Sequence, residues 1–236
     1  MKKTVFTLIL TLIALSTSAQ NLIGAWESHS TTADGDIVKL VLIITDNYYS
    51  KTTYNTSTNA FMSTSGGSWE LEGNRFTKRI EFNSENPETV GTAITSIVRI
   101  TDSEIVFLDD HLKVKRIDDG TPGALQGAWL MSGRTIDGET QIRNTNTPRK
   151  TMKILSGTRF QWIAYNTETK QFMATGGGTY TTVDGKYTES IEFFSRDSSR
   201  VGLELEFNYN LKNDHWHHTG FSTKGNPIDE IWSKRK

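Results

Sequence analysis

The sequence contains no cysteine in its 236 residues. Disulfide bonds, thiolate chemistry and lipid attachment through a cysteine are therefore excluded, because each requires that side chain. Without covalent cross-links, the stability of the fold must come from packing alone. Beyond the first twenty residues, no segment is as apolar as the roughly 20 consecutive residues that a membrane-spanning helix needs. We therefore expect no stable membrane insertion.

A dense basic segment is also missing from both halves of the chain. Residues 21–120 carry nine Lys and Arg against fifteen Asp and Glu, a net charge of −6, whereas residues 121–236 carry fifteen against twelve, a net charge of +3. Binding to a phosphate backbone relies on clustered cations, so we expect no nucleic-acid partner. The asymmetry of charge also indicates that the two halves have different roles.

The first nineteen residues have the order of a secretory signal peptide. Lys2 and Lys3 precede an apolar stretch from Val5 to Leu15, and small and polar residues follow up to Ala19. We expect cleavage after Ala19 and export to the periplasm or the cell exterior. The alternative is a membrane anchor, but an apolar stretch of about eleven residues is too short to span a bilayer.

An internal repeat is the strongest signal in the sequence. Leu22-Ile23-Gly24-Ala25-Trp26 returns as Leu125-Gln126-Gly127-Ala128-Trp129. The offset between the copies then lengthens at an insertion around Thr140–Pro148 and stays constant, and the repeated pairs include Tyr54 with Tyr165, Phe61 with Phe172, and Ile80-Glu81-Phe82 with Ile191-Glu192-Phe193. A shared pattern at a nearly fixed offset reports a duplicated unit. We predict a signal peptide over residues 1–19 and two domains over residues 20–119 and 124–236, with the insertion forming a loop in the second copy only.

Each copy has the pattern of β-strands throughout. Residues 187–193 and 76–82 alternate bulky and polar side chains, and turn signals such as Asp184-Gly185 separate the strands. No stretch of ten residues has a helical apolar period. About eight antiparallel strands in roughly 100 residues close most economically into a barrel, which removes exposed sheet edges. The prediction is an all-β chain of two tandem barrels of about eight strands each, with an open β-sandwich per copy as the alternative.

The repeated motifs resemble those of a known family. Leu-x-Gly-x-Trp at the start of each copy, the meander of hairpins and a basic residue at the end are similar to lipocalin-type, or calycin, barrels. The second copy further resembles lipocalin-like domains of unknown function from exported proteins of Bacteroidetes-type bacteria. That likeness rests on Gly176-Gly177-Gly178-Thr179-Tyr180, Trp216-x-His218-x-Gly220 and Glu230-Ile231-Trp232-x-x-Arg235. It implies a barrel with an internal cavity and no established reaction.

The same resemblance implies a contact at the closed end of each barrel. In lipocalin-type barrels a tryptophan of the first strand packs beneath an arginine of the last strand. Aligning Lys115-Arg116 with Lys234-Arg235 pairs Trp26 with Arg116 and Trp129 with Arg235. An indole face attracts a guanidinium, so we expect both pairs to have a structural role.

Matched positions at which the copies differ point to the second copy as the binding domain. In the register that aligns Tyr54 with Tyr165, the second copy has Trp162 in place of Lys51, Glu189 in place of Lys78, Trp216 in place of Ile105 and His218 in place of Phe107. Strand alternation places Tyr187, Glu189, Ile191 and Phe193 on one face. If these faces point inward, the second barrel holds a pocket for a small organic ligand. Its predicted lining is Trp162, Tyr180, Tyr187, Glu189, Trp216 and His218.

Other interpretations of these residues remain open. The first is a small-molecule enzyme that uses Glu189 or His218 as acid or base, and the second is an interaction module whose barrels present loops. We predict no metal site, since His215 and His217 share a face but no third ligand is placed, and no other cofactor. The triple glycine Gly176–Gly178 indicates a bulge or bend. The first copy should be mainly structural, because Lys51 and Lys78 would be costly in an apolar cavity unless paired.

Overall fold

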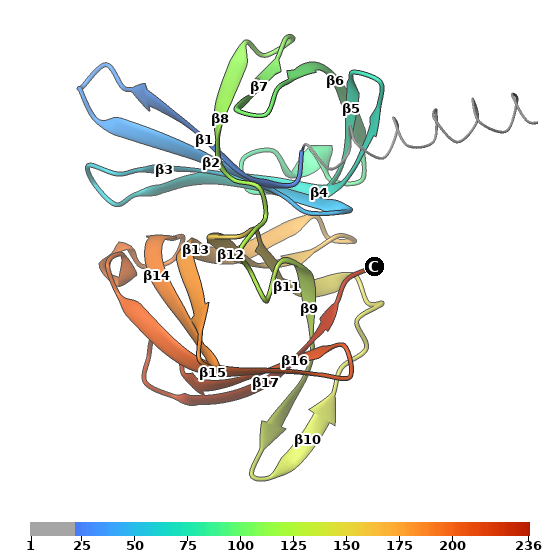
Figure 1. Ribbon diagram of the computed structural model, residues 1–236, viewed down its shortest axis with the longest axis vertical. Helices are drawn as coiled ribbons and strands as arrows, with labels where there is room; N and C mark the ends of the chain where they lie inside the picture. Colours follow the sequence, from blue (N-terminus) through green and yellow to red (C-terminus); the bar gives the residue numbers. More distant parts are fainter. Residues whose placement is uncertain (1–21) are drawn as a thin grey trace, which may run out of the picture.

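A computed structural model describes residues 22–236, and these form two closed antiparallel barrels that stand one above the other in Figure 1. In the first barrel every strand pairs with its neighbour in sequence, and the last pairs with the first. Its strands are β1 (Gly24–Thr31), β2 (Ile37–Ile44), β3 (Tyr48–Asn55), β4 (Phe61–Glu72), β5 (Arg75–Asn83), β6 (Ala93–Ile100), β7 (Glu104–Phe107) and β8 (Leu112–Asp118).

The second barrel repeats this order and is closed by pairing between β9 and β17. Its eight strands are β9 (Gly127–Ile136), β11 (Arg149–Leu155), β12 (Arg159–Asn166), β13 (Gln171–Val183), β14 (Lys186–Phe194), β15 (Glu204–Lys212), β16 (His215–Phe221) and β17 (Pro227–Lys234). Each barrel has one short 3₁₀ helix after its fifth strand, namely η1 (Pro87–Thr89) and η2 (Ser198–Arg200). The predicted fold class of two eight-stranded antiparallel barrels is confirmed.

The insertion of the second copy is only partly the predicted loop. Its beginning forms an extra strand, β10 (Glu139–Ile142), which pairs with the end of β9 outside the closed barrel. Asp137 and Gly138 both have positive φ, at 52° and 81°, which suits a tight hairpin turn. The expectation of a loop around Thr140–Pro148 was therefore wrong for residues 140–142, because this turn brings them back along β9. Residues 143–148 then connect β10 to β11.

A β-bulge in the second barrel changes which residues point inward. Gly178 pairs with Ile191 and Gly177 with Phe193, so Glu192 is the extra residue of the bulge. A Cβ atom on Gly178 would lie 2.0 Å from the carbonyl oxygen of Ser190, so only glycine fits there. The predicted bulge is thus present. Phe193, expected on the inner face with Ile191, instead points outward, because the extra residue reverses the alternation.

Outward-facing side chains of both barrels form a core between them. It includes Phe193 beyond this bulge and Phe82 beyond the equivalent bulge at Glu81 of the first barrel. This inter-barrel core contains buried side chains of β2, β3 and β5 from the first copy and of β9, β11, β12 and β14 from the second. Tyr54 packs on Phe193 with ring centroids 5.0 Å apart, and the equivalent pair, Tyr165 and Phe82, is 4.9 Å apart. The first barrel supplies the tyrosine in one pair and the phenylalanine in the other. Because the contact is reciprocal, the barrels are related by a local two-fold axis.

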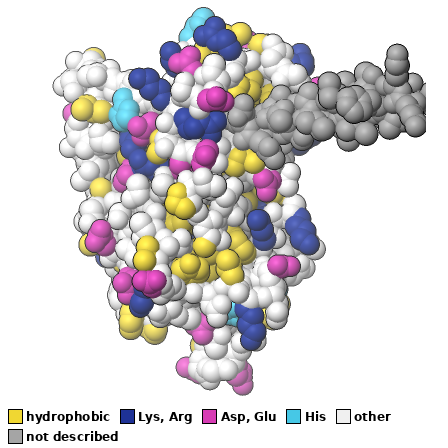
Figure 2. Space-filling model, in the orientation of Figure 1, with side chains coloured by type: hydrophobic (Ala, Val, Ile, Leu, Met, Phe, Trp, Pro, Cys, Tyr) yellow, Lys and Arg dark blue, Asp and Glu magenta, His cyan; other side chains and the backbone are white. Residues whose placement is uncertain are grey.

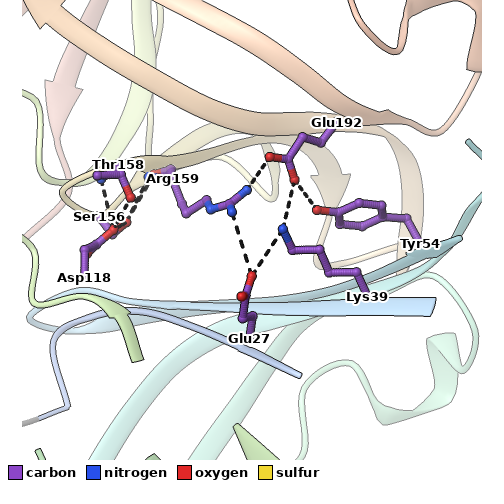
Figure 3. A network of polar contacts seen from close by, with 8 residues as sticks. All are labelled: Glu27, Lys39, Tyr54, Asp118, Ser156, Thr158, Arg159 and Glu192. Atoms are coloured by element: carbon purple, nitrogen blue, oxygen red, sulfur yellow. Dashed lines mark hydrogen bonds and ion pairs between the residues drawn. The ribbon is translucent and has the colours of Figure 1, made fainter. Parts of the chain in front are cut away.

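Polar contacts surround this core with the same symmetry. The Tyr54 hydroxyl donates to Glu192, and the Tyr165 hydroxyl donates to Glu81 at 2.7 Å. Glu192 also contacts Lys39 and Arg159, as Figure 3 shows. Burial and then the charge of Glu192 raise the pKa of Tyr54, so its hydroxyl remains a proton donor at neutral pH.

Asp118 joins the barrels at the end of β8. Its carboxylate accepts hydrogen bonds from Ala25 N of the first barrel and from Gly157 N and Thr158 N of the second, at 3.0–3.2 Å. The Ser156 hydroxyl donates to it at 2.9 Å, and the Thr158 hydroxyl also donates to it (Figure 3). A buried carboxylate with this many donors fixes the start of residues 119–126, which lead into β9.

The closed ends of the barrels confirm one of the two predicted tryptophan contacts. The Arg116 guanidinium carbon lies 3.9 Å from the centre of the Trp26 ring. In the second barrel Trp129 pairs with Lys234 in the β9–β17 ladder, and Arg235 binds Glu81 at 2.8 Å in the inter-barrel region. The expected contact of Trp129 with Arg235 is therefore wrong, because an extra residue of β9, Ser132, shifts the β9–β17 register by one and places Lys234 opposite Trp129.

Two further expectations concern the signal peptide and membrane insertion. The expected signal peptide, residues 1–19, lies outside the described residues, so cleavage after Ala19 stays a prediction. Within residues 22–236, none of the helices has the length and apolar character needed to cross a membrane.

Candidate functional site

Five of the six predicted pocket residues lie inside the second barrel. Tyr187 and Trp216 are fully buried, His218 is 1% exposed, and Tyr180 and Glu189 are each 4% exposed. Tyr180 lies toward the closed end, where its hydroxyl donates to Ser156 O at 2.6 Å. The inward orientation follows from strand alternation, as the sequence predicted.

The interior is filled by a residue that the sequence comparison did not select. Lys153 of β11 is 5% exposed, and its Nζ lies 2.8 Å from Glu189 Oε1. The same ammonium lies 4.9 Å from the ring centres of Tyr187 and Trp216 and 5.4 Å from that of Trp232. These are cation–π distances. The aromatic cage that we expected to hold a ligand thus encloses a cation of the protein itself.

Lys153 could have been found from the repeat. It stands at the position of Leu42 in the first copy, and it is a lysine in the otherwise apolar run Met152-Lys153-Ile154-Leu155. A charged residue that replaces a core leucine opposite an acquired Glu189 signals a buried ion pair. The comparison of the copies considered positions at which the second copy gains an aromatic, carboxylate or imidazole group. It did not consider the gain of a lysine at Lys153.

The remaining bonds of Glu189 are also made within the protein. The Tyr187 hydroxyl donates to Glu189 Oε1 at 2.8 Å, and burial followed by the charge of Glu189 raises the pKa of Tyr187 well above its ordinary value. Glu189 therefore has a fixed cation and a fixed hydroxyl donor. A carboxylate held in this way has a structural role in the barrel interior.

His218 has a separate partner. Its Nδ1 lies 3.3 Å from Glu230 Oε2, and the same carboxylate oxygen accepts a hydrogen bond from Trp232 Nε1 at 3.1 Å. Burial, and then the positive charge of Lys153, lower the pKa of His218 below its ordinary value. Burial opposes ionisation of Glu230, but the hydrogen bond from His218 and the charge of Lys153 hold the pKa of Glu230 below its usual range. The pair is thus a neutral imidazole on a carboxylate at pH 7.

The sequence also left open an acid–base role for Glu189 or His218, whereas it predicted no metal site at His215 and His217. Glu189 and His218 share the barrel interior, but each is bonded to a different partner, and neither lines either of the two pockets of the second barrel described below. Among residues 22–236, no group of three or more His, Asp or Glu side chains could hold a metal ion. His215 and His217 lie on β16 without a further ligand in that part of the chain.

Trp162, the sixth predicted residue, lies in a pocket at the open end of the second barrel. The pocket has a volume of about 470 Å³. It lies where β11 begins, where β14 ends and where β16 turns into β17, at the end of the barrel away from Trp129. Trp162 packs edge to face on Phe194 with ring centroids 5.5 Å apart. The lining is Arg149, Trp162, Ala164, Met173, Ala174, Phe194, Arg196, Asp197, Arg200, Thr223 and Lys224.

The charged residues of this pocket are mostly cations. Four of its lining side chains are Arg or Lys, whereas Asp197 is its single acid. Asp197 forms an ion pair with Arg200 at 3.0 Å. Arg196 donates to the carbonyl oxygen of Met173, and within residues 22–236 no ion pair neutralises it. The open end therefore carries excess positive charge beside two aromatic rings. On the face drawn in Figure 2, cationic and acidic side chains are interspersed.

The first barrel has a smaller pocket of different character. Its volume is about 140 Å³, and its lining includes Lys51, Lys78 and Asp110. Burial and then the charge of Lys51 lower the pKa of Lys78, while Asp110 opposes this shift. Lys51 and Lys78, which we expected to be costly in an apolar cavity unless paired, line this pocket together with Asp110. It is smaller than the pocket of the second barrel that contains Trp162.

Comparison with known proteins adds a family match for the second barrel. Residues 124–236 match the family model Domain of unknown function (DUF4488). No curated protein matches the chain. The two eight-stranded barrels fit the lipocalin-like fold that the sequence motifs resemble, and the matched residues begin just before β9 and include all of the second barrel.

Proposed function

We propose that this chain is an exported small-molecule-binding protein, a carrier or sensor, whose ligand site is the open-end pocket of the second barrel. The observation that carries the proposal is a pocket of about 470 Å³ with Trp162 and Phe194 in its wall. Pockets for small organic ligands have volumes of about 300–1,000 Å³ and combine apolar surface with a few polar groups. The order of charged, apolar and small residues before Gln20 supports export.

The position of the pocket revises the site that the sequence suggested. Lys153 and its aromatic neighbours fill the middle of the barrel, so a ligand would bind between them and the open end and would contact Trp162. Tyr180, Tyr187, Glu189, Trp216 and His218 would then support the pocket from below without lining it. The fixed partners of Glu189 and His218 also favour binding over acid–base catalysis. We propose no nucleic-acid partner, in keeping with the charge balance of both halves.

The test is a titration of the purified chain with N-phenyl-1-naphthylamine, an uncharged aromatic probe whose fluorescence rises in apolar surroundings. We expect saturable binding that is lost in Trp162→Ala and in Ala164→Leu, since the first removes the aromatic wall and the second fills the pocket. Val183→Ala is the matched control, because Val183 is 61% exposed and lies at the far end of β13. Equal binding by all three variants would exclude this pocket.

A further inference from the structure

Five matched positions around the pocket differ together between the two copies. In the register that aligns Tyr54 with Tyr165, the second copy has Arg149 in place of Val38, Trp162 in place of Lys51, Phe194 in place of Asn83, Arg196 in place of Glu85 and Arg200 in place of Thr89. All five residues of the second copy line the pocket. The second barrel has thus gained two aromatic rings and three guanidinium groups at one site, in exchange for one ammonium and one carboxylate.

These guanidinium groups are incompletely neutralised. Within the part of the chain that the structure describes, the side chains of Arg149 and Lys224 form no ion pair, and Arg196 binds only a main-chain oxygen. Arg200 is the exception, because Asp197 pairs with it. Cations gathered around a concave site attract an anion, since the low-dielectric walls strengthen their combined field.

A second pocket extends this positive region. It has a volume of about 290 Å³, and its lining includes Arg143, Arg149 and Lys150 but no acidic residue. Burial and then the repulsion of Arg134 lower the pKa of Arg143. Its wall also contains Asn144, Thr145 and Thr147 of the insertion that the first copy lacks. Arg149 lines both pockets, so its side chain borders each of them.

We propose that the ligand of the open-end pocket is an amphipathic organic anion. Its apolar body would lie against Trp162 and Phe194, and its carboxylate, sulfate or phosphate group would be bound by Arg149 and Arg196. Guanidinium groups suit these oxyanions, because their planar N–H donors match two oxygens at once. This inference rests on the proposed function and adds the chemical class of the ligand.

The experiment compares two probes that share one aromatic body. Anilinonaphthalene sulfonate carries a sulfonate on the anilinonaphthalene group, and N-phenyl-1-naphthylamine carries none. We expect the sulfonate probe to bind the wild-type chain about tenfold more tightly, the factor that one charge-assisted contact contributes. In the double variant Arg149→Gln/Arg196→Gln, the Kd of the sulfonate probe should rise about tenfold, and that of the neutral probe should change less than about twofold.

Controls separate this inference from the proposed function. Arg99→Gln removes an exposed arginine of the first barrel and should leave both Kd values unchanged. Excess inorganic phosphate should weaken binding of the sulfonate probe alone, and only when Arg149 and Arg196 are present. Equal affinities for the two probes, or a sulfonate affinity that survives the double variant, would overturn the anion assignment. If neither probe binds in a manner that depends on Trp162, the proposed function itself fails.

Discussion

Lys153 and Glu189 form an ion pair inside the second barrel, with Nζ 2.8 Å from Oε1 and side chains only 6% and 5% exposed. The equivalent residues of the first barrel are Leu42 and Lys78, so the two barrels differ at both positions of the pair. The pair occupies the space in which a calyx would hold a ligand. The pocket that we propose as the ligand site therefore lies at the open end, where Trp162 lines it.

Breaking this ion pair should destabilise the protein strongly. Lys153→Met leaves Glu189 buried without a cation, so we expect the free energy of unfolding to fall by about 3–5 kcal/mol. The double variant Lys153→Met/Glu189→Gln should be less destabilised than the sum of the single variants, because no uncompensated charge remains. Urea denaturation followed by circular dichroism measures both effects.

The control for that experiment is an exposed ion pair of the same barrel. Lys186 and Glu206 lie 2.9 Å apart with side chains 46% and 60% exposed. Lys186→Gln should therefore cost less than about 1 kcal/mol. If Lys153→Met were as mild as this control, the buried pair would not have the role assigned to it.

The two-fold relation between the barrels makes Tyr54 and Tyr165 equivalent. Each hydroxyl donates to a glutamate of the opposite barrel, so Tyr54→Phe and Tyr165→Phe should each lower the free energy of unfolding by about 1–3 kcal/mol. Tyr49→Phe is a matched control, because the buried Tyr49 hydroxyl has no partner within the described residues. A loss for Tyr49→Phe equal to that of the other two would refute the assignment of these bonds.

Asp118 should matter far more than its neighbour Asp119. Asp118→Asn removes the charge that several main-chain N–H groups share, so we expect a loss of about 2–3 kcal/mol in thermal or urea unfolding. The exposed Asp119 accepts hydrogen bonds from Thr121, and Asp119→Asn should cost less than about 1 kcal/mol. Similar losses for both variants would contradict the account of the linker.

The buried imidazole of His218 predicts a pH dependence of stability. Because its pKa is lowered in the folded state, the unfolded chain binds a proton at this residue under conditions where the folded chain does not. The free energy of unfolding should therefore fall as pH decreases from about 6.5, the ordinary pKa of histidine, toward the lower folded pKa. His218→Phe, which introduces the residue found at Phe107, should reduce this slope. An unchanged slope between about pH 7 and pH 5 would count against the lowered pKa.

The fold could be predicted from sequence because its signals are local. Alternation in residues such as 187–191 reflects one face in the core, and the repeat indicates two copies of the same strands. The bulge at Glu192 could not be located from alternation alone, since an extra residue reverses every later side chain. The shift that places Lys234 opposite Trp129 arises in the same way.

The candidate site was only partly predictable. Exchanges between the copies selected Trp162, which lines the open-end pocket, and Glu189 and His218, which are buried inside the barrel. They could not show that Lys153 fills the interior, because which charged groups meet depends on packing across strands far apart in sequence. Tyr54 is retained as Tyr165, so a comparison of the differences between the copies does not select it, yet it forms a contact between the barrels.

The most direct test of the account is ¹⁹F NMR of the chain with its six tryptophans replaced by 5-fluorotryptophan. The Trp162 resonance is assigned as the one missing from a Trp162→Phe variant. On addition of anilinonaphthalene sulfonate, the account predicts that this resonance shifts in a saturable manner, while those of Trp26 and Trp69 in the first barrel do not. A bound probe that leaves the Trp162 resonance unchanged, or that shifts the resonances of the first barrel instead, would contradict it.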